Sequence, residues 1–220
     1  MFGRWLADAG VAVDIRRPYA GDSLPAHLDG GGVMVLGGSM GACDDDGVPW
    51  LAEVRSMLAE AAERQVPVLG ICLGAQMLAA ACGGRVERSG TGGEIGLGDI
   101  DINDEGRKDS LFSGMPSRVQ AAQWHVDEIT DLPAGAVLLA SSPRCAVQAF
   151  RLGRRAWGVQ FHPEASGALM QAWVGAEESL PPDGLGRLQL AVAEITAAED
   201  RLFASWKGFA ERFASIVREG

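Results

Sequence analysis

The stretch from Val66 to Gly84 constrains the fold more than any other part of this chain. It begins with a short apolar run, 66–71, which is bounded by turn-forming residues and is typical of a buried strand. The sequence then becomes rich in Ala, Leu, Gln and Met, which favour a helix, and Gly83-Gly84 is a typical helix end. Cys72 lies at the junction. The sequence therefore predicts a sharp strand-to-helix turn with a cysteine at its apex.

Two glycines support a role for Cys72 as a nucleophile. Gly70 and Gly74 lie two residues before and after it, where a side chain would collide with the reversing backbone, as in the Gly-x-Ser-x-Gly elbow of hydrolases. The helix N-terminus favours a thiolate and directs unpaired N–H groups toward a negative oxygen formed beside the sulfur. The alternative is a buried structural cysteine, but the glycine spacing and the strand-to-helix change coincide at this residue. The other cysteines are interpreted as small apolar residues: Cys43, Cys82 and Cys145.

Composition limits the classes of partner. The chain has 220 residues, of which 47% are hydrophobic, so it is long enough for one domain with a full core. Its formal net charge of -10 argues against binding to nucleic acid or to an anionic membrane surface. It has no apolar run of transmembrane length, and its first residues lack the apolar region of a signal peptide. We therefore expect a cytoplasmic protein that binds a small molecule or another protein.

Helix and strand signals alternate along the first half of the chain. We expect helices at 2–9 and 50–64, strands at 11–15, 33–36 and 66–71, and the helix that follows Cys72. This alternation predicts an α/β fold with a doubly wound, mostly parallel sheet, in which ligands bind at the carboxyl ends of the strands. After Gly84, short extended runs predict a small antiparallel extension: 85–87, 94–102, 119–124, 137–140 and 146–150.

A second candidate catalytic group follows a predicted strand near residue 160. The strand ends at Phe161 and delivers His162 to the same edge of the sheet as Cys72. Pro163 fixes a turn, so that Glu164 can fold back and accept a hydrogen bond from one ring nitrogen, leaving the other free to exchange a proton with the thiol. A lone histidine at a strand end is usually structural. Its pairing with the Cys72 turn favours the catalytic interpretation.

The C-terminal tail, residues 165–220, lies mostly outside the motifs described so far. Residues 185–217 have the pattern of one or two amphipathic helices. We expect a main domain at 1–164 and a helical extension at 165–220 that packs on it. The alternative is that the tail forms a docking surface for a partner enzyme.

Three motifs together resemble a known family. Gly37-Gly38-Ser39, the segment 70–76 around Cys72, and the segment 161–164 around His162 occur in the order found in class I (triad) glutamine amidotransferases. Within that family the chain is most similar to stand-alone proteins like the amidotransferase domain of GMP synthase. The resemblance implies a flavodoxin-like fold, with Cys72 as nucleophile, His162 as base and acid, and Glu164 as its orienting partner.

The resemblance also implies how glutamine is held. The main-chain N–H groups of Gly38 and Leu73 form the oxyanion hole in this interpretation. The remaining substrate-side residues that it implies are Ser39, Gln76, His125 and Val126. For His125, a structural role is an alternative of equal weight. Val126 stands where the family often has glycine, so a positive φ at this position would be strained.

A further departure concerns the start of the sheet. The family begins with an apolar strand before the helix that starts here at Phe2, and the given sequence has no counterpart to it. Either the start was assigned late or the domain is built without this inner strand. Such a fold leaves backbone groups and an apolar edge unpaired, which predicts self-association.

The predicted reaction is the hydrolysis of the side-chain amide of L-glutamine to glutamate and ammonia through a cysteine thioester, with the ammonia passed to a separate acceptor synthase subunit. One alternative is hydrolysis of other γ-glutamyl amides or peptides, and another is a non-catalytic regulatory protein on the same scaffold. No cofactor and no metal are expected. Asp44, Asp45 and Asp46 are interpreted as groups that serve the N-terminus of the following helix.

Overall fold

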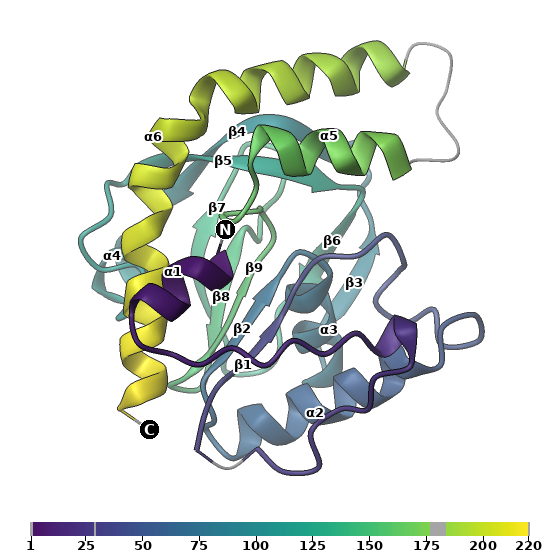
Figure 1. Ribbon diagram of the computed structural model, residues 1–220, viewed down its shortest axis with the longest axis vertical. Helices are drawn as coiled ribbons and strands as arrows, with labels where there is room; N and C mark the ends of the chain where they lie inside the picture. Colours follow the sequence, from purple (N-terminus) through teal and green to yellow (C-terminus); the bar gives the residue numbers. More distant parts are fainter. Residues whose placement is uncertain (1, 29, 177–183, 220) are drawn as a thin grey trace.

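The computed structural model describes residues 2–28, 30–176 and 184–219. Within them, a sheet of seven strands runs in the order β1-β2-β9-β8-β7-β4-β5, and β3 pairs with β6 in a second, two-stranded sheet. Figure 1 shows helices on both sides of the large sheet. The helices are α1 (Phe2–Asp8), the short 3-10 helix η1 (Pro18–Ala20), α2 (Trp50–Glu63), α3 (Leu73–Ala81), α4 (Asp104–Lys108), α5 (Gly167–Ala176) and α6 (Gly184–Arg218). The strands are β1 (Val33–Val35), β2 (Val68–Ile71), β3 (Arg85–Arg88), β4 (Glu94–Ile102), β5 (Arg118–His125), β6 (Asp127–Asp131), β7 (Val137–Ser141), β8 (Ala149–Leu152) and β9 (Ala156–Val159).

The core is divided between the two faces of the sheet. On one face, α2 and α3 bury an apolar stripe that includes Leu51, Val54, Leu58 and Met77. On the other face, α6 packs against β4 and β5, and α1 packs against α6. The helix predicted at 50–64 and the helix after Cys72 are thus confirmed. The first buries the apolar face that its periodicity indicates, whereas α3 is buried on all sides from Leu73 to Ala79.

The sheet is mixed, and its parallel part is smaller than predicted. Strands β1, β2 and β9 are parallel to one another, whereas β9-β8-β7-β4-β5 is antiparallel throughout. Parallel neighbours need a long crossover connection, and β8 and β9 are joined by residues 153–155 alone. The predicted small antiparallel extension is therefore a large part of the main sheet.

The strand predicted at 11–15 is wrong. This segment has no strand structure, and its side chains Val13 and Ile15 are 45% and 61% exposed. Among the described residues, β1 pairs only with β2 and lies at the sheet edge, so no described neighbouring strand supplies a hydrogen-bonding ladder for 11–15. Alternation of apolar residues creates a strand only where such a partner exists. The predicted self-association remains a prediction.

The tail packs on the sheet as one long helix, α6, which bends around the edge of the molecule (Figure 1). Its apolar side chains belong to the same core cluster as the sheet and α1, with rings of Trp5 and Phe203 5.8 Å apart and those of Phe2 and Phe209 6.4 Å apart. The indole N–H of Trp206 donates to the carbonyl of Gln120 at 2.9 Å. The described residues before and after position 164 therefore share one core.

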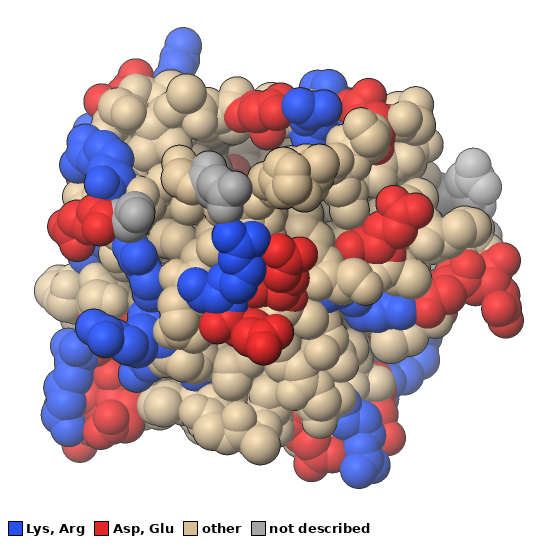
Figure 2. Space-filling model, turned by 90° about the horizontal axis from the view of Figure 1, so that it is seen from below, with Lys and Arg blue, Asp and Glu red and all other residues tan. Residues whose placement is uncertain are grey.

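The surface carries both signs of charge. Figure 2 shows one face on which blue Lys and Arg side chains alternate with red Asp and Glu, so that no single-sign patch covers it despite the net charge of -10. None of the helices in the described ranges combines the length and apolarity needed to cross a membrane.

Candidate active site

The junction between β2 and α3 is the predicted elbow. Cys72 lies between Ile71, the last residue of β2, and Leu73, the first of α3, with φ 52° and ψ -107°. This left-handed backbone is costly for a residue with a side chain, and such strain is concentrated at functional sites. A Cβ on Gly70 would lie 2.5 Å from the carbonyl carbon of Gly74. A Cβ on Gly74 would overlap the carbonyl group of Val35 on β1. The tight turn therefore depends on both glycines.

His162 and Glu164 form a buried pair just beyond β9. The Nδ1 atom of His162 lies 2.8 Å from Oε1 of Glu164, and the two residues are 4% and 8% exposed. Because a carboxylate only accepts hydrogen bonds, Nδ1 carries the proton and Nε2 is left for chemistry. The main-chain N–H of His162 donates to the carbonyl of Ala122 on β5 at 2.8 Å. This hydrogen bond fixes the backbone position from which the imidazole side chain extends.

The elbow and the His–Glu pair meet at one edge of the sheet. The main-chain N–H of Cys72 donates to the carbonyl of Val159, the last residue of β9, and the thiol donates to the main-chain carbonyl of Trp124, on β5, at 3.7 Å. Gly37, after β1, lies against both groups: a Cβ there would be 2.9 Å from Cε1 of His162 and 3.6 Å from Cβ of Cys72. The structure thus brings together Cys72, His162 and Glu164, although about 90 residues separate the cysteine from the His–Glu pair in the sequence.

The surroundings of His162 favour its charged form. Burial has the largest influence and lowers the pKa of the imidazole, but the negative charges of Glu164 and Cys72 and their hydrogen bonds outweigh it. The pKa of His162 is therefore held well above its ordinary value of 6.5. An imidazolium beside the sulfur stabilises a thiolate, the nucleophilic form of cysteine.

This raised pKa predicts a pH dependence of stability. The stabilisation is present in full below pH 6.5 and is lost as the pH rises through the raised pKa. We expect Glu164→Gln to be less stable than wild type near neutral pH, and the difference in the free energy of unfolding to shrink at alkaline pH. Urea unfolding of both proteins across this range measures the difference. A gap that widens with rising pH would contradict the assignment.

One aromatic ring packs against the imidazole. The ring of Trp173, on α5, lies 4.7 Å from the ring of His162 and 5.9 Å from that of Trp124. Cys72 is only 6% exposed, so the reacting groups are shielded from bulk water. No sequence signal marked Trp173, because it lies outside the motifs and only the packing of α5 brings it here.

The glycine loop after β1 lies against the start of α3. A Cβ on Gly38 would be 2.8 Å from Cδ2 of Leu73, so the two residues are close neighbours. As the first residue of α3, Leu73 has an N–H group with no acceptor inside the helix. Ser39 follows in the same loop and is exposed. This arrangement can supply main-chain donors to an oxyanion formed beside the sulfur.

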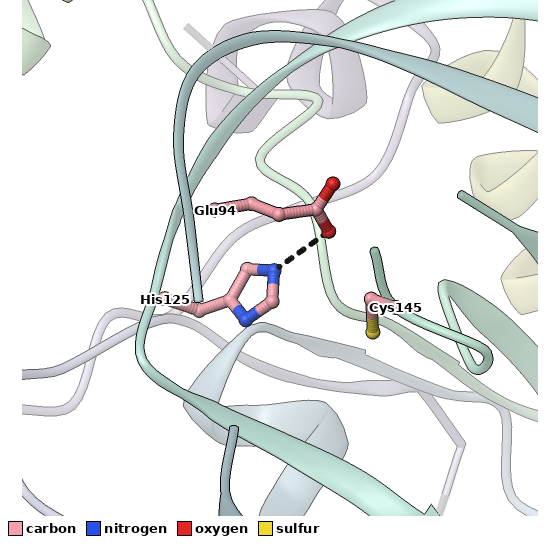
Figure 3. A group of neighbouring side chains, drawn as sticks. All are labelled: Glu94, His125 and Cys145. Carbon is pink, nitrogen blue, oxygen red and sulfur yellow. Dashed lines mark hydrogen bonds and ion pairs between the residues drawn. The ribbon is translucent and has the colours of Figure 1, made fainter. Parts of the chain in front are cut away.

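His125 is held by internal partners (Figure 3). Its Nε2 lies 3.3 Å from Oε2 of Glu94, and its Nδ1 lies 2.9 Å from the carbonyl of Asp127. Glu94 also accepts hydrogen bonds from Ser142 and Gln148. Burial raises the pKa of Glu94 and is the largest influence, but the hydrogen bonds from His125 and Ser142 outweigh it and lower the pKa. Of the two alternatives for His125, the geometry supports the structural one.

The strain expected at Val126 does not occur. Among the described residues, only Gln65 and Cys72 combine a side chain with a positive φ. The close approach at this corner is made instead by Gly93, with φ +72°, whose Cβ would lie 2.7 Å from Cα of Val126. The glycine that the corner needs is thus on the facing segment, and Val126 is 40% exposed.

Among the described residues, one group of possible metal ligands is present. The ligand atoms of Glu94, His125 and Cys145 lie within 4.8 Å of one another (Figure 3). However, the carboxylate and the imidazole are hydrogen-bonded to protein groups, and the thiol donates to the carbonyl of Val147 at 3.4 Å. Burial, the largest influence, raises the pKa of Cys145 to about 12, which disfavours the thiolate that binds metals. We interpret the cluster as a structural hydrogen-bond network.

The aspartates before α2 do not cap that helix, contrary to expectation. The N-cap of α2 is Pro49, without a side-chain cap. Asp45 forms an ion pair with Arg55 at 2.5 Å, and Asp44 accepts a hydrogen bond from the main-chain N–H of Gly41 at 2.7 Å. These carboxylates therefore stabilise the loop and its contact with the helix rather than the helix end.

Comparison with known proteins identifies the class of this fold and site. The chain belongs to the class I glutamine amidotransferase family, a family of hydrolases, because the family profile "Glutamine amidotransferase class-I" matches residues 3–174. The fold agrees: a glutamine amidotransferase from Thermotoga maritima superposes with a TM-score of 0.83 at 28% identity, covering 97% of this chain and 91% of that one. One from Methylobacillus flagellatus gives a TM-score of 0.82 at 29% identity, covering 97% and 86%.

Curated relatives point to a particular branch of the family. The chain is 32% identical over 164 residues to the A subunit of the glutamine-hydrolyzing GMP synthase of Natronomonas pharaonis, covering 74% of this chain and 80% of that protein. It is 43% identical over 105 residues to the corresponding protein of Thermococcus kodakarensis, covering 47% of this chain. That match spans 54% of the Thermococcus protein, about half its length. The chain is thus similar to the A subunit of GMP synthase.

Proposed function

We propose that this protein hydrolyses the side-chain amide of L-glutamine and supplies the ammonia to a separate synthase subunit. The observation that carries the proposal is the position of Cys72, on a strained elbow, with Gly37 lying against both Cys72 and the buried, hydrogen-bonded His162–Glu164 pair. The family and its named relatives support glutamine as substrate. We also propose a cytoplasmic location, as expected from the sequence.

The first half-reaction forms a thioester. The thiolate of Cys72 attacks the side-chain carbonyl carbon of glutamine, a C–S bond forms, and the π electron pair moves to the oxygen. The main-chain N–H groups of Gly38 and Leu73 stabilise this oxyanion, and donors of this kind contribute roughly 2.7–4 kcal/mol each. The C–N bond then breaks, and His162 donates its Nε2 proton to the leaving nitrogen, which departs as ammonia.

The second half-reaction releases glutamate. His162, now neutral, accepts a proton from water as the water oxygen attacks the thioester carbon. The tetrahedral intermediate collapses, the C–S bond breaks and its electron pair returns to sulfur. Glu164 holds the ring in one tautomer throughout and stabilises its charged form. The net reaction is glutamine plus water to glutamate plus ammonia.

The proposal that ammonia passes to another subunit is supported by the names of the relatives. The proteins matched by this chain are named as one component of GMP synthase. We propose a partner synthase subunit that activates the ammonia acceptor.

A substrate panel tests the proposal. Ammonia or amine release is measured with glutamine, γ-glutamyl methylamide and a γ-glutamyl dipeptide, using Cys72→Ala as the control. We expect glutamine to have the highest kcat/KM and an acid quench to trap a glutamyl adduct on Cys72. Preference for the dipeptide would instead indicate a γ-glutamyl peptide hydrolase. Inactivity on every compound, with and without a partner synthase, would indicate a non-catalytic protein.

A further inference from the structure

Gln160 is a buried polar side chain that the mechanism above does not use. It follows β9, two residues before His162, and is 1% exposed. Its Nε2 donates to Sγ of Cys72 at 3.6 Å. The sulfur therefore contacts an uncharged N–H donor in addition to the main-chain carbonyl of Trp124, which lies 3.7 Å away.

The orientation of this amide is fixed by a second glutamine. Gln76, on α3, uses its Nε2 to donate to the carbonyl of Asp127 at 3.0 Å and to Oε1 of Gln160 at 3.1 Å. Because a main-chain carbonyl can only accept, the Gln76 amide group facing it must be the NH₂. It follows that Gln160 turns its oxygen toward Gln76 and its NH₂ toward the sulfur.

The same contacts give Gln76 a role beside the substrate contact that the sequence predicts. Both protons of its amide are directed to groups inside the protein, Asp127 and Gln160. Its main-chain N–H donates to the carbonyl of Cys72 at 3.0 Å, so its backbone is tied to the elbow as well. A side chain fixed in this way can serve the site by orienting its neighbour.

An N–H donor at this position acts on one state of the nucleophile. A thiolate is a strong acceptor, whereas a thiol accepts only weakly, so the contact favours the ionised form. The imidazolium loses its proton in each catalytic cycle, but an amide does not titrate. The donor is therefore in place when thioester hydrolysis returns the electron pair to sulfur.

We propose that Gln160 is a positioning residue that holds Cys72 as an oriented thiolate, and that Gln76 fixes the Gln160 amide for this task. The inference deepens the proposed function, because it rests on Cys72 being the nucleophile.

The test measures the state of the sulfur without any substrate. Alkylation of Cys72 by iodoacetamide is followed by peptide mass spectrometry as a function of pH, with the exposed Cys43 as an internal reference for the reagent. The variants are Gln160→Met, which removes the donor, and Gln160→Glu, which replaces it with a carboxylate of similar size. The matched control is Gln123→Met, because Gln123 is also 1% exposed and its amide has no hydrogen-bond partner in the described structure.

We expect the midpoint of the Cys72 alkylation profile to move upward by about one pH unit in Gln160→Met, since a hydrogen bond to a charged group is lost. The shift is larger in Gln160→Glu, because a negative charge then faces the sulfur. Gln123→Met keeps the wild-type midpoint. We also expect kcat for glutamine to fall about tenfold in Gln160→Met at neutral pH, as about 1.4 kcal/mol corresponds to tenfold, with KM nearly unchanged.

An unchanged midpoint in either folded Gln160 variant would overturn the proposal, as would an equal shift in Gln123→Met. If Gln160→Met does not fold, the alkylation midpoint of Gln160→Glu alone tests the proposal. Failure of the proposed function is distinguishable, because a protein that does not hydrolyse glutamine can still show the shift in alkylation.

Discussion

The Cys72→Ala variant is expected to lose about 10⁴-fold or more of the wild-type kcat for glutamine hydrolysis. Without the sulfur, no thioester can form, and only binding and oxyanion stabilisation remain to assist direct attack by water. The measurement is ammonia release under saturating glutamine, with detection of the glutamyl adduct as a second readout. The elbow, the His162–Glu164 pair and the core are otherwise preserved.

Cys43→Ala is the matched control, because Cys43 is exposed and lies outside the site. The Cys43→Ala variant should retain wild-type activity, and its Cys72 should be alkylated at the same rate as Cys72 of the wild-type protein. A Cys72→Ala protein that keeps more than a tenth of wild-type activity would show that another group attacks the amide, and the proposed mechanism would have to be abandoned.

Gly74→Ala should destabilise the protein by about 3 kcal/mol or more, the upper range for overpacking a core. The added methyl would overlap the carbonyl group of Val35, with 2.7 Å to its carbon, and both contacting groups are backbone held in place by β1 and α3. No side-chain rotation can relieve this overlap. Urea unfolding monitored by circular dichroism measures the loss.

Gly175→Ala provides the comparison for this change. Gly175 lies in α5, is exposed, and a Cβ there meets no atom within 4 Å. Alanine is favoured over glycine inside a helix by roughly 0.5–1 kcal/mol, so this variant should be slightly more stable than wild type. Equal effects of the two substitutions would mean that the elbow tolerates a side chain at position 74.

The parts of the site that could be predicted from the sequence are those determined by local geometry. A cysteine between glycines at a strand-to-helix junction produces the elbow wherever the strand lies, and the two-residue spacing from His162 to Glu164 allows their hydrogen bond. Each needs only a few consecutive residues. The catalytic roles themselves stay predictions until they are tested.

The parts that could not be predicted depend on distant partners. Segment 11–15 has the pattern of a strand but has no described neighbour to pair with. Strand β6, Asp127–Asp131, is largely acidic and lacks apolar alternation, yet β3 provides a partner. The Gln160 contact with sulfur depends on which way an amide is turned. Sequence periodicity does not contain this information.

The packing of α1 against α6 has a consequence for synthesis of the chain. Phe2 and Trp5 are made well before the rings they contact, those of Phe209 and Phe203, which lie about 200 residues later in the sequence. Elongation at about 5–20 residues per second leaves these two apolar side chains without their native cover for roughly ten seconds or more. The docking of α1 onto α6 is therefore expected to be among the last steps of folding.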